Sequence, residues 1–171
     1  MERSKKVIFI SHCILNQNTV VSPLARAKGP YRDIINIIMD YGIGIHQLPC
    51  PEFRHLGLKR EPMTKEEYDT EEYRILCKKI SKDIINVMKE YLNNGYQIVG
   101  LIGINSSPTC GIRKEKGILM EELLSLASKL EINLKTIYVP TNYRDGDIGK
   151  EFVIELERFI NQAQVTKNTC S

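Results

Sequence analysis

The sequence predicts an α/β domain whose mostly parallel sheet is flanked by helices. Two features indicate this fold class. Short continuous apolar runs of strand length, such as residues 7–10 and 98–104, are typical of strands that are buried on both faces. These runs alternate along the chain with longer segments in which apolar residues recur at helical spacing, the pattern of βαβ units. We therefore expect a single three-layer, Rossmann-like domain with roughly four to five strands.

The first part of the chain predicts a strand, a helix and a second strand. The apolar run 7–10 is the first strand, and isoleucines at helical spacing predict a helix over about 31–40. Gly42 then ends that helix. Residues 43–48 predict the second strand, which the prolines after it terminate. The connection 16–30 is long enough to suggest a lid or substrate loop.

The middle of the chain predicts a polar loop and then a long helix. The loop is expected over 53–64. Thr64 followed by Glu67 is a capping-box pattern, so a helix is expected from 65 to about 92. The Asn-Asn-Gly sequence at 93–95 ends it.

The last part of the chain predicts one more βαβ unit and a final helix. The expected elements are a strand, a helix, a strand and a helix over 98–104, 118–130, 136–139 and about 148–160. The remaining residues, 164–171, are polar, so we expect a domain over 1–163 and a polar tail over 164–171.

Composition narrows the classes of function. The 171 residues are 42% hydrophobic, which is enough for one buried core. The net charge of +3 is small and the basic residues are spread among acidic ones, so nucleic acid is not an expected partner. No apolar run approaches the roughly 20 residues of a membrane helix, and no secretory signal pattern follows the N-terminus. We expect a cytoplasmic monomer or homodimer whose cysteines are thiols or metal ligands and not disulfides.

Three of the five cysteines stand where an expected strand ends: Cys13, Cys50 and Cys110. The carboxyl ends of parallel strands meet at one edge of a sheet, and ligands bind there. We therefore expect these thiols to converge although they are remote in sequence. Three thiolates with one open position suit a catalytic metal centre better than a closed structural one. Cys77 is expected to be a small core residue in the long helix, and Cys170 lies in the tail.

The surroundings of single cysteines also fit simpler explanations. Proline after Cys50 stiffens the turn and brings Glu52 near whatever the sulfur binds, yet Cys50 alone could be a buried structural cysteine. Arg113 and Lys114 follow Cys110 closely, and their charge would lower the pKa of its thiol. A plain turn between strand and loop would explain the same residues.

The three histidines are weaker candidates. His12 directly precedes Cys13, but alternation along an extended strand end would point it away from that sulfur. His46 lies in the second expected strand and His55 in the loop after Cys50. Any of them could orient a substrate or replace a missing ligand, and His46 is the one best explained by packing.

Three short boxes together resemble a known family. They are Ser11-His12-Cys13-Ile14, Cys50-Pro51-Glu52 and Ser107-Pro108-Thr109-Cys110-Gly111. Their order resembles the thiouracil desulfidase (TudS) family, whose members have Ser-x-Cys-Leu, Cys-Pro-Glu and Ser-Pro-Ser-Cys-Gly boxes. The resemblance spans roughly residues 7–115. Asn16 stands where the family has glycine, Thr109 where it has serine, and residues 27–31 where it has an Arg-Tyr-Asp-Gly stretch, which is typical of a divergent branch.

The resemblance implies a cofactor and a reaction. It implies that the three cysteines hold a [4Fe-4S] cluster with one iron free of protein ligands, and that the substrate is a thiolated small molecule such as a thiouracil-like thiocarbonyl. The reaction is then a non-redox, hydrolytic desulfuration that releases sulfide. Glu52 is the expected general base, and Ser107 is expected to bind the substrate or relay a proton. Glu52 could instead be a helix-end or Arg54-paired carboxylate, and Ser107 could cap a turn.

Other functions remain open at the level of sequence. Three cysteines with His12 or His55 could form a Cys₃His zinc site in a binding module, although no Cys-x-x-Cys pair is present. A metal-free enzyme could use Cys110 as nucleophile with a histidine base. A sulfur carrier or sensor would bind a cluster without turnover.

Overall fold

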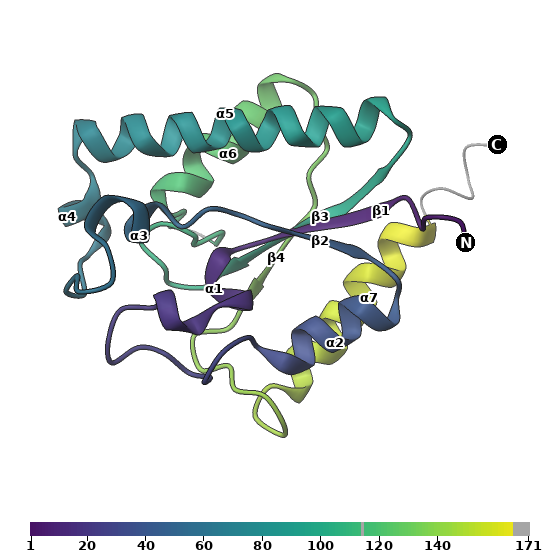
Figure 1. Cartoon of the computed structure of the whole chain (residues 1–171), viewed down its shortest axis with the longest axis horizontal. Coiled ribbons are helices and arrows are strands. Elements are labelled where there is room, and N and C mark those ends of the chain that lie inside the picture. Colours follow the sequence, from purple (N-terminus) through teal and green to yellow (C-terminus); the bar gives the residue numbers. More distant parts are fainter. Residues whose placement is uncertain (114, 166–171) are drawn as a thin grey trace.

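A parallel sheet lies at the centre of the molecule, and this confirms the expected α/β fold (Figure 1). The computed structural model describes residues 1–113 and 115–165. The sheet has four strands in the order β2-β1-β3-β4, and each neighbouring pair is parallel. The strands are β1 (Lys6–Ile10), β2 (Gly44–Gln47), β3 (Gln97–Ile104) and β4 (Thr136–Val139).

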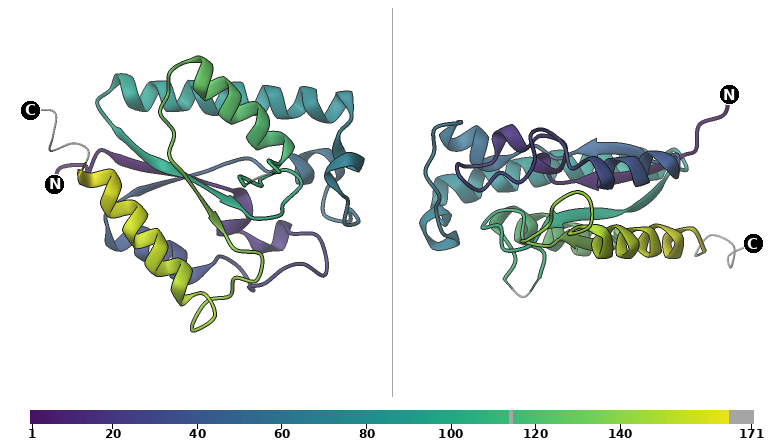
Figure 2. Two further views of the ribbon diagram at one scale, coloured as in Figure 1. Left: turned by 180° about the vertical axis from the view of Figure 1, so that it is seen from behind. Right: turned by 90° about the horizontal axis from the view of Figure 1, so that it is seen from below.

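Helices cover both faces of the sheet, as expected for three layers (Figures 1 and 2). One face carries α5 (Glu71–Asn93) and α6 (Ile118–Lys129), which pack against each other and on the sheet. The other face carries α2 (Arg32–Asp40) and α7 (Lys150–Val165). Each pair of helices buries its apolar face against the sheet, so the sheet lies between two hydrophobic cores.

The sequence of β1 shows why this strand needs a helix layer on each side. Successive side chains of a strand point to opposite faces. Val7 and Phe9 belong to the core under α5 and α6, whereas Ile8 and Ile10 belong to the core under α2 and α7. All four side chains are at most 3% exposed, so the continuous apolar run reflects burial on both faces.

Two sequence-based expectations for the middle of the chain are wrong in detail. The expected loop 53–64 begins inside a helix, α3 (Pro51–Leu56). This helix forms because Cys50 acts as its N-cap, with its sulfur accepting the Phe53 N–H at 3.4 Å, and because proline suits the first helical position. The short helix is followed by a turn at Gly57.

The expected long helix is split. The predicted capping box of Thr64 and Glu67 is confirmed, but it starts a short helix, α4 (Lys65–Tyr68). A new N-cap, Thr70, then accepts the Tyr73 N–H at 3.2 Å and starts α5. A threonine that bonds the backbone in this way competes with continuation of the preceding helix.

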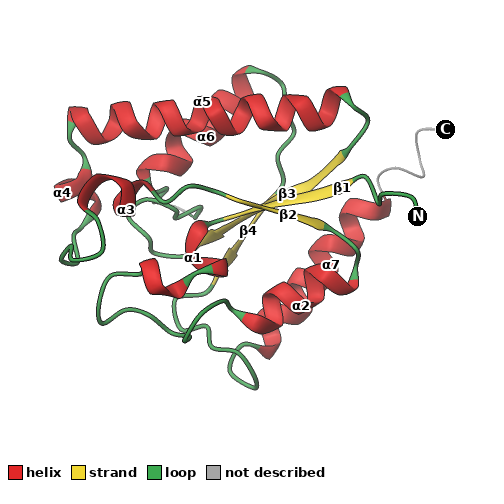
Figure 3. Cartoon of the chain, in the orientation of Figure 1, coloured by secondary structure: helices red, strands yellow, loops and turns green. Residues whose placement is uncertain are grey.

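The remaining differences lie at the ends of elements. Residues after β1 turn at once into α1 (His12–Leu15) and a 3₁₀ turn (Gln17–Thr19), and do not continue as an extended strand (Figure 3). The last helix, α7, extends to Val165 and so includes the first two residues of the expected tail. The rest of that tail, including Cys170, lies outside the described residues.

No helix in the described part of the chain combines the length and the apolar character that a membrane crossing requires.

The turn after β3 folds back onto the end of that strand. The carbonyl of Cys110 accepts the Ile104 N–H at 3.0 Å, and the Tyr73 hydroxyl bonds the Thr109 hydroxyl at 2.7 Å in a buried contact. Gly117 makes this fold possible, because a Cβ on it would lie 2.2 Å from the carbonyl carbon of Thr109. The position of Cys110 therefore depends on close backbone packing.

Gly117→Ala is expected to destabilise the protein by about 1–3 kcal/mol, the cost of overpacking a rigid site. The new Cβ would overlap backbone atoms of the Cys110 turn. The measurement is the urea midpoint of unfolding. Gly29→Ala is the matched control, since its Cβ would meet nothing within 4 Å. Equal midpoints for the two variants would contradict this account.

Candidate functional site

The carboxyl ends of β1, β2 and β3 open into one cavity of about 290 Å³. Cys13, Cys50 and Cys110 all line it, although they are remote in sequence. The two predicted catalytic residues, Glu52 and Ser107, line it as well. The structure therefore brings the five predicted site residues together, as the parallel arrangement of the strand ends requires.

The three thiols are close enough to influence one another electrostatically. The pKa of Cys13 is raised to about 12, mainly by burial and in part by repulsion from negative charge on Cys50 and Glu52. Burial also raises the pKa of Cys110 well above its usual value, with smaller contributions from Cys13 and Cys50. In the protein without a bound cation, these groups are therefore neutral thiols near pH 7.

The expected lowering of the Cys110 pKa by the nearby basic residues is not the net result, because burial raises that pKa well above its usual value. Arg113 lies over the ring of Tyr138 on β4, at 5.0 Å from its centroid. Lys114 lies outside the described residues. The sequence places positive charge near Cys110 along the chain, but the turn directs the guanidinium to the neighbouring strand.

Cys50 has a defined hydrogen-bond donor. As the N-cap of α3, its sulfur accepts the Phe53 backbone N–H, and this contact lowers the pKa of the thiol against the larger rise caused by burial. Backbone N–H donors to cysteine sulfur are among the contacts that tune iron–sulfur centres. Cys50 therefore has a polar partner that stabilises a thiolate.

Glu52 is paired with Arg60 and not with Arg54. The Nε and Nη2 atoms of Arg60 lie 3.3 and 3.2 Å from Oε2 of Glu52. Arg60 is almost fully buried and also donates to the carbonyls of Thr19 at 2.7 Å and Gly57 at 3.0 Å. The Arg60 guanidinium thus links the Glu52 carboxylate to Thr19 in the 3₁₀ turn and to Gly57 at the end of α3.

Ser107 has a role within its own turn. Its hydroxyl oxygen accepts the N–H of Cys110 at 3.0 Å and that of Thr109 at 3.3 Å. The predicted turn-capping role is therefore present. The hydroxyl proton is not used in either bond, so Ser107 remains able to donate into the cavity that it lines.

The loop 16–30 adds residues that the sequence did not single out. Gln17 is buried, donates to the carbonyl of Cys13 at 2.8 Å and accepts the Arg26 N–H at 2.9 Å. The Arg26 side chain lies near the Tyr31 hydroxyl, and it lowers the pKa of Cys13 against the larger effect of burial. None of the ion pairs among the described residues includes Arg26. The sequence indicated this segment by its length, which suggested a lid or substrate loop, and by the position of residues 27–31 where the resembled family has an arginine-containing stretch.

The opposite wall of the cavity is apolar. Tyr68, whose pKa is raised to about 12 mainly by burial, contributes an aromatic ring there. The other apolar residues of the lining come from the loop 16–30, the segment after α3 and the end of β3: Val20, Val21, Leu24, Pro62, Met63 and Ile104. The cavity thus has polar groups near the thiols and a wall suited to a flat organic molecule.

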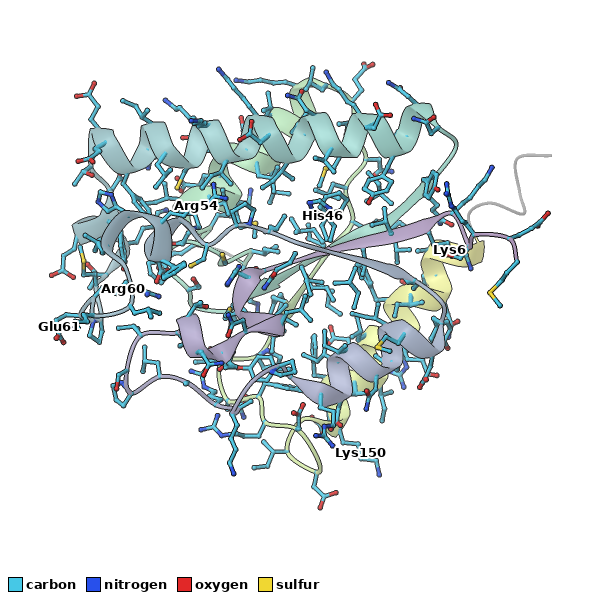
Figure 4. The ribbon with its side chains drawn as sticks, viewed as in Figure 1. Lys6, His46, Arg54, Arg60, Glu61 and Lys150 are labelled. Carbon is cyan, nitrogen blue, oxygen red and sulfur yellow. The ribbon has the colours of Figure 1, made fainter. Side chains whose placement is uncertain are left out.

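Of the three histidines, His12 alone lines this cavity. Its Nδ1 lies 3.3 Å from the carbonyl of Leu48, and burial is the main reason that its pKa is lowered. The alternation from which His12 was expected to point away from the Cys13 sulfur does not apply, because the chain enters α1 here and does not continue as a strand. His46 lies between β2 and α5 (Figure 4). Its ring packs against those of Phe9 and Tyr91.

His55 and Cys77 do not line the cavity. His55 packs against Tyr73, and its Nδ1 lies 4.0 Å from Glu72. Cys77 is fully buried in the core under α5, as expected for a small core residue. Among the described residues, no group of three or more His, Cys, Asp or Glu side chains is spaced to hold a single metal ion.

Comparison with known proteins places the chain in a family. Residues 5–122 match the family described as "Putative 2-thiouracil desulfurase". An uncharacterized protein of the archaeon Methanocaldococcus jannaschii is 47% identical over 158 residues, covering 92% of this chain and 99% of the relative. No solved structure matches significantly. The matched segment contains all three cysteines and both predicted catalytic residues, and the chain belongs to the 2-thiouracil desulfurase family.

Proposed function

We propose that this protein is a [4Fe-4S]-dependent desulfidase that removes sulfur from a thiolated small molecule. The observation that carries this proposal is the convergence of three thiols, from three remote turns, in one cavity with a carboxylate and an apolar wall. Family membership supports the desulfurase activity. The substrate, the cluster and the hydrolytic route are the parts that we propose.

The donor set of the cavity suits an iron–sulfur cluster. Thiolates are the usual ligands of such clusters, and the chain offers three of them: Cys13, Cys50 and Cys110. Ligands of a cluster bind different iron atoms, so they need not meet at one point as ligands of a single zinc ion must. The absence of a single-ion site among the described residues therefore argues against the Cys₃His zinc alternative.

The raised pKa values also suit a bound cationic group. Burial keeps the metal-free thiols protonated, and iron binding would replace those protons. When bound, the cluster supplies a soft, electron-accepting iron toward which the sulfur of a thiocarbonyl can be directed.

The protein's own groups then supply the remaining chemistry. We infer that Glu52 takes a proton from the attacking water at Oε1, because Oε2 accepts both hydrogen bonds from Arg60. Water adds oxygen to the carbon, and the sulfur leaves as sulfide. No electrons are transferred: thiocarbonyl and water become carbonyl and hydrogen sulfide. The Ser107 hydroxyl is placed to donate to the substrate or relay that proton.

Arg26 is placed to orient the substrate. It lines the cavity and lies near Tyr31 and Cys13, without a carboxylate partner among the ion pairs of the described residues. A guanidinium in that position would donate to an oxygen of a planar thiolated compound. The apolar wall would hold the ring of such a compound and limit the access of bulk water.

Anaerobic reconstitution with iron and sulfide tests the cofactor. Wild type is expected to become brown and to release sulfide from at least one thiolated base, thioamide or thio-acid. Cys13→Ala, Cys50→Ala and Cys110→Ala should each lose the cluster, because each removes a ligand. Cys77→Ala should keep it. Iron content, visible absorption and released sulfide are measured, and cluster-loaded wild type without turnover would favour a sulfur carrier.

Glu52→Gln separates catalysis from cluster binding. The substitution keeps the shape of the side chain but removes the base, so sulfide release should fall by about 10²–10⁴-fold. Iron content should stay at the wild-type level. Glu66→Gln, an exposed change on α4, is the control and should leave turnover unchanged. Wild-type turnover in Glu52→Gln would remove Glu52 from the proposed mechanism.

Thiol alkylation tests the metal-free cysteine enzyme. With a pKa of about 12, about one Cys13 in 10⁴ is a thiolate at pH 8, and the nucleophilic fraction rises tenfold per pH unit. Iodoacetamide should therefore label Cys13 and Cys110 of the metal-free protein far more slowly than free cysteine, as followed by peptide mass analysis. Labelling of Cys110 near pH 7 as fast as free cysteine would instead support an activated nucleophile.

A further inference from the structure

The side-chain hydroxyl of Ser11 is buried but forms no hydrogen bond among the described residues. The residue is 0% exposed, and its Oγ is one of the buried side-chain atoms without a hydrogen-bond partner among the described residues. It stands at the N-cap of α1, where serine usually accepts a helix N–H, yet it makes no such bond. A buried hydroxyl without a partner is unfavourable, so its retention there calls for an explanation.

Ser11 lies close to the Cys110 turn of the candidate site. Its backbone N–H donates to Ile102 of β3 at 2.9 Å, so it lies at the junction of β1 and β3. The Cys110 turn folds back onto the end of the same strand through Ile104. The Ser11 hydroxyl is near enough to the Cys110 sulfur to lower the pKa of that thiol, against the larger rise caused by burial. The contact does not meet normal hydrogen-bond geometry while the sulfur is a thiol.

We propose that Ser11 is a positioning residue whose hydroxyl donates a hydrogen bond to the sulfur of Cys110 when that sulfur is a thiolate ligand. A thiolate is a far better acceptor than a thiol, so ligation supplies the partner that the hydroxyl lacks. Ser11 is fully buried and does not line the cavity, so its hydroxyl can reach a ligand sulfur but not a substrate in the cavity. The inference rests on the proposed function.

The Ser11 hydroxyl should affect the reduction potential of the cluster, which a measurement of turnover alone would not reveal. Hydrogen bonds to ligand sulfurs are among the factors that set the reduction potential of an iron–sulfur cluster. A donor next to Cys110 stabilises negative charge on the sulfur, so it favours the reduced cluster, which carries one more electron. Loss of the donor should therefore shift the midpoint potential to a lower value.

The test compares Ser11→Ala with Ser81→Ala. Ser81, on α5, is a matched control because its Oγ is also buried and without a partner among the described residues, whereas only Ser11 is named among the groups that act on the Cys110 thiol. Both variants and wild type are reconstituted anaerobically, and iron content and midpoint potential are measured by redox titration. We expect equal iron content in all three, a lower midpoint in Ser11→Ala and an unchanged midpoint in Ser81→Ala.

A second measurement uses the metal-free protein and does not depend on reconstitution. Ser11→Ala is made in wild type and in Cys110→Ala, and the shift in the urea midpoint of unfolding is compared. Because the buried hydroxyl has no partner while the sulfur of Cys110 is a thiol, its removal should not destabilise the metal-free protein, and the shift should be the same in the Cys110→Ala background. A destabilising shift in metal-free wild type that disappears in the Cys110→Ala background would show a hydrogen bond to the thiol, and it would overturn the proposal that ligation supplies the partner.

The outcomes separate this inference from the proposed function. Iron binding by all three proteins with the same midpoint in Ser11→Ala and wild type would overturn the inference and leave the desulfidase proposal standing. Failure of wild type itself to bind iron would overturn both.

Discussion

The site depends on the adjacency of three strand ends in a parallel sheet. Because β1 lies between β2 and β3, the turns that follow these strands face one cavity, and each turn carries a cysteine. Burial of three thiols beside a carboxylate makes ionisation of the sulfurs unfavourable. An environment of this kind strongly favours a bound cationic group over free thiolates, because only such a group compensates the negative charge.

The scaffold around the sulfurs is built from backbone contacts more than from side chains. Cys50 caps a helix, and Cys110 is held through its own carbonyl and through the buried bond between Tyr73 and Thr109. These contacts fix the backbone of each turn independently of what the sulfur binds. The site is therefore preorganised in its backbone, and binding of a cofactor would require adjustment mainly of side chains.

The sequence predicted the strands and the convergence of the cysteines because these features follow from local apolar runs and from parallel topology. It did not predict α3, since the cap that starts this helix is a cysteine sulfur, an unusual capping group. The partner of Glu52 was also missed. Arg60 lies in a segment that appears only polar in sequence, and its burial depends on the Thr19 carbonyl from a distant loop. Contacts of this kind have no periodic signal.

The guanidinium of Arg60 also constrains how the substrate range of this family can change. It links Glu52, at the start of α3, to Thr19 in the segment 16–30, which lines the cavity. Replacement of that segment by one from a relative would alter the support of the carboxylate at the same time as the shape of the cavity. Evolution or engineering of new specificity must therefore treat the two segments as one inherited unit.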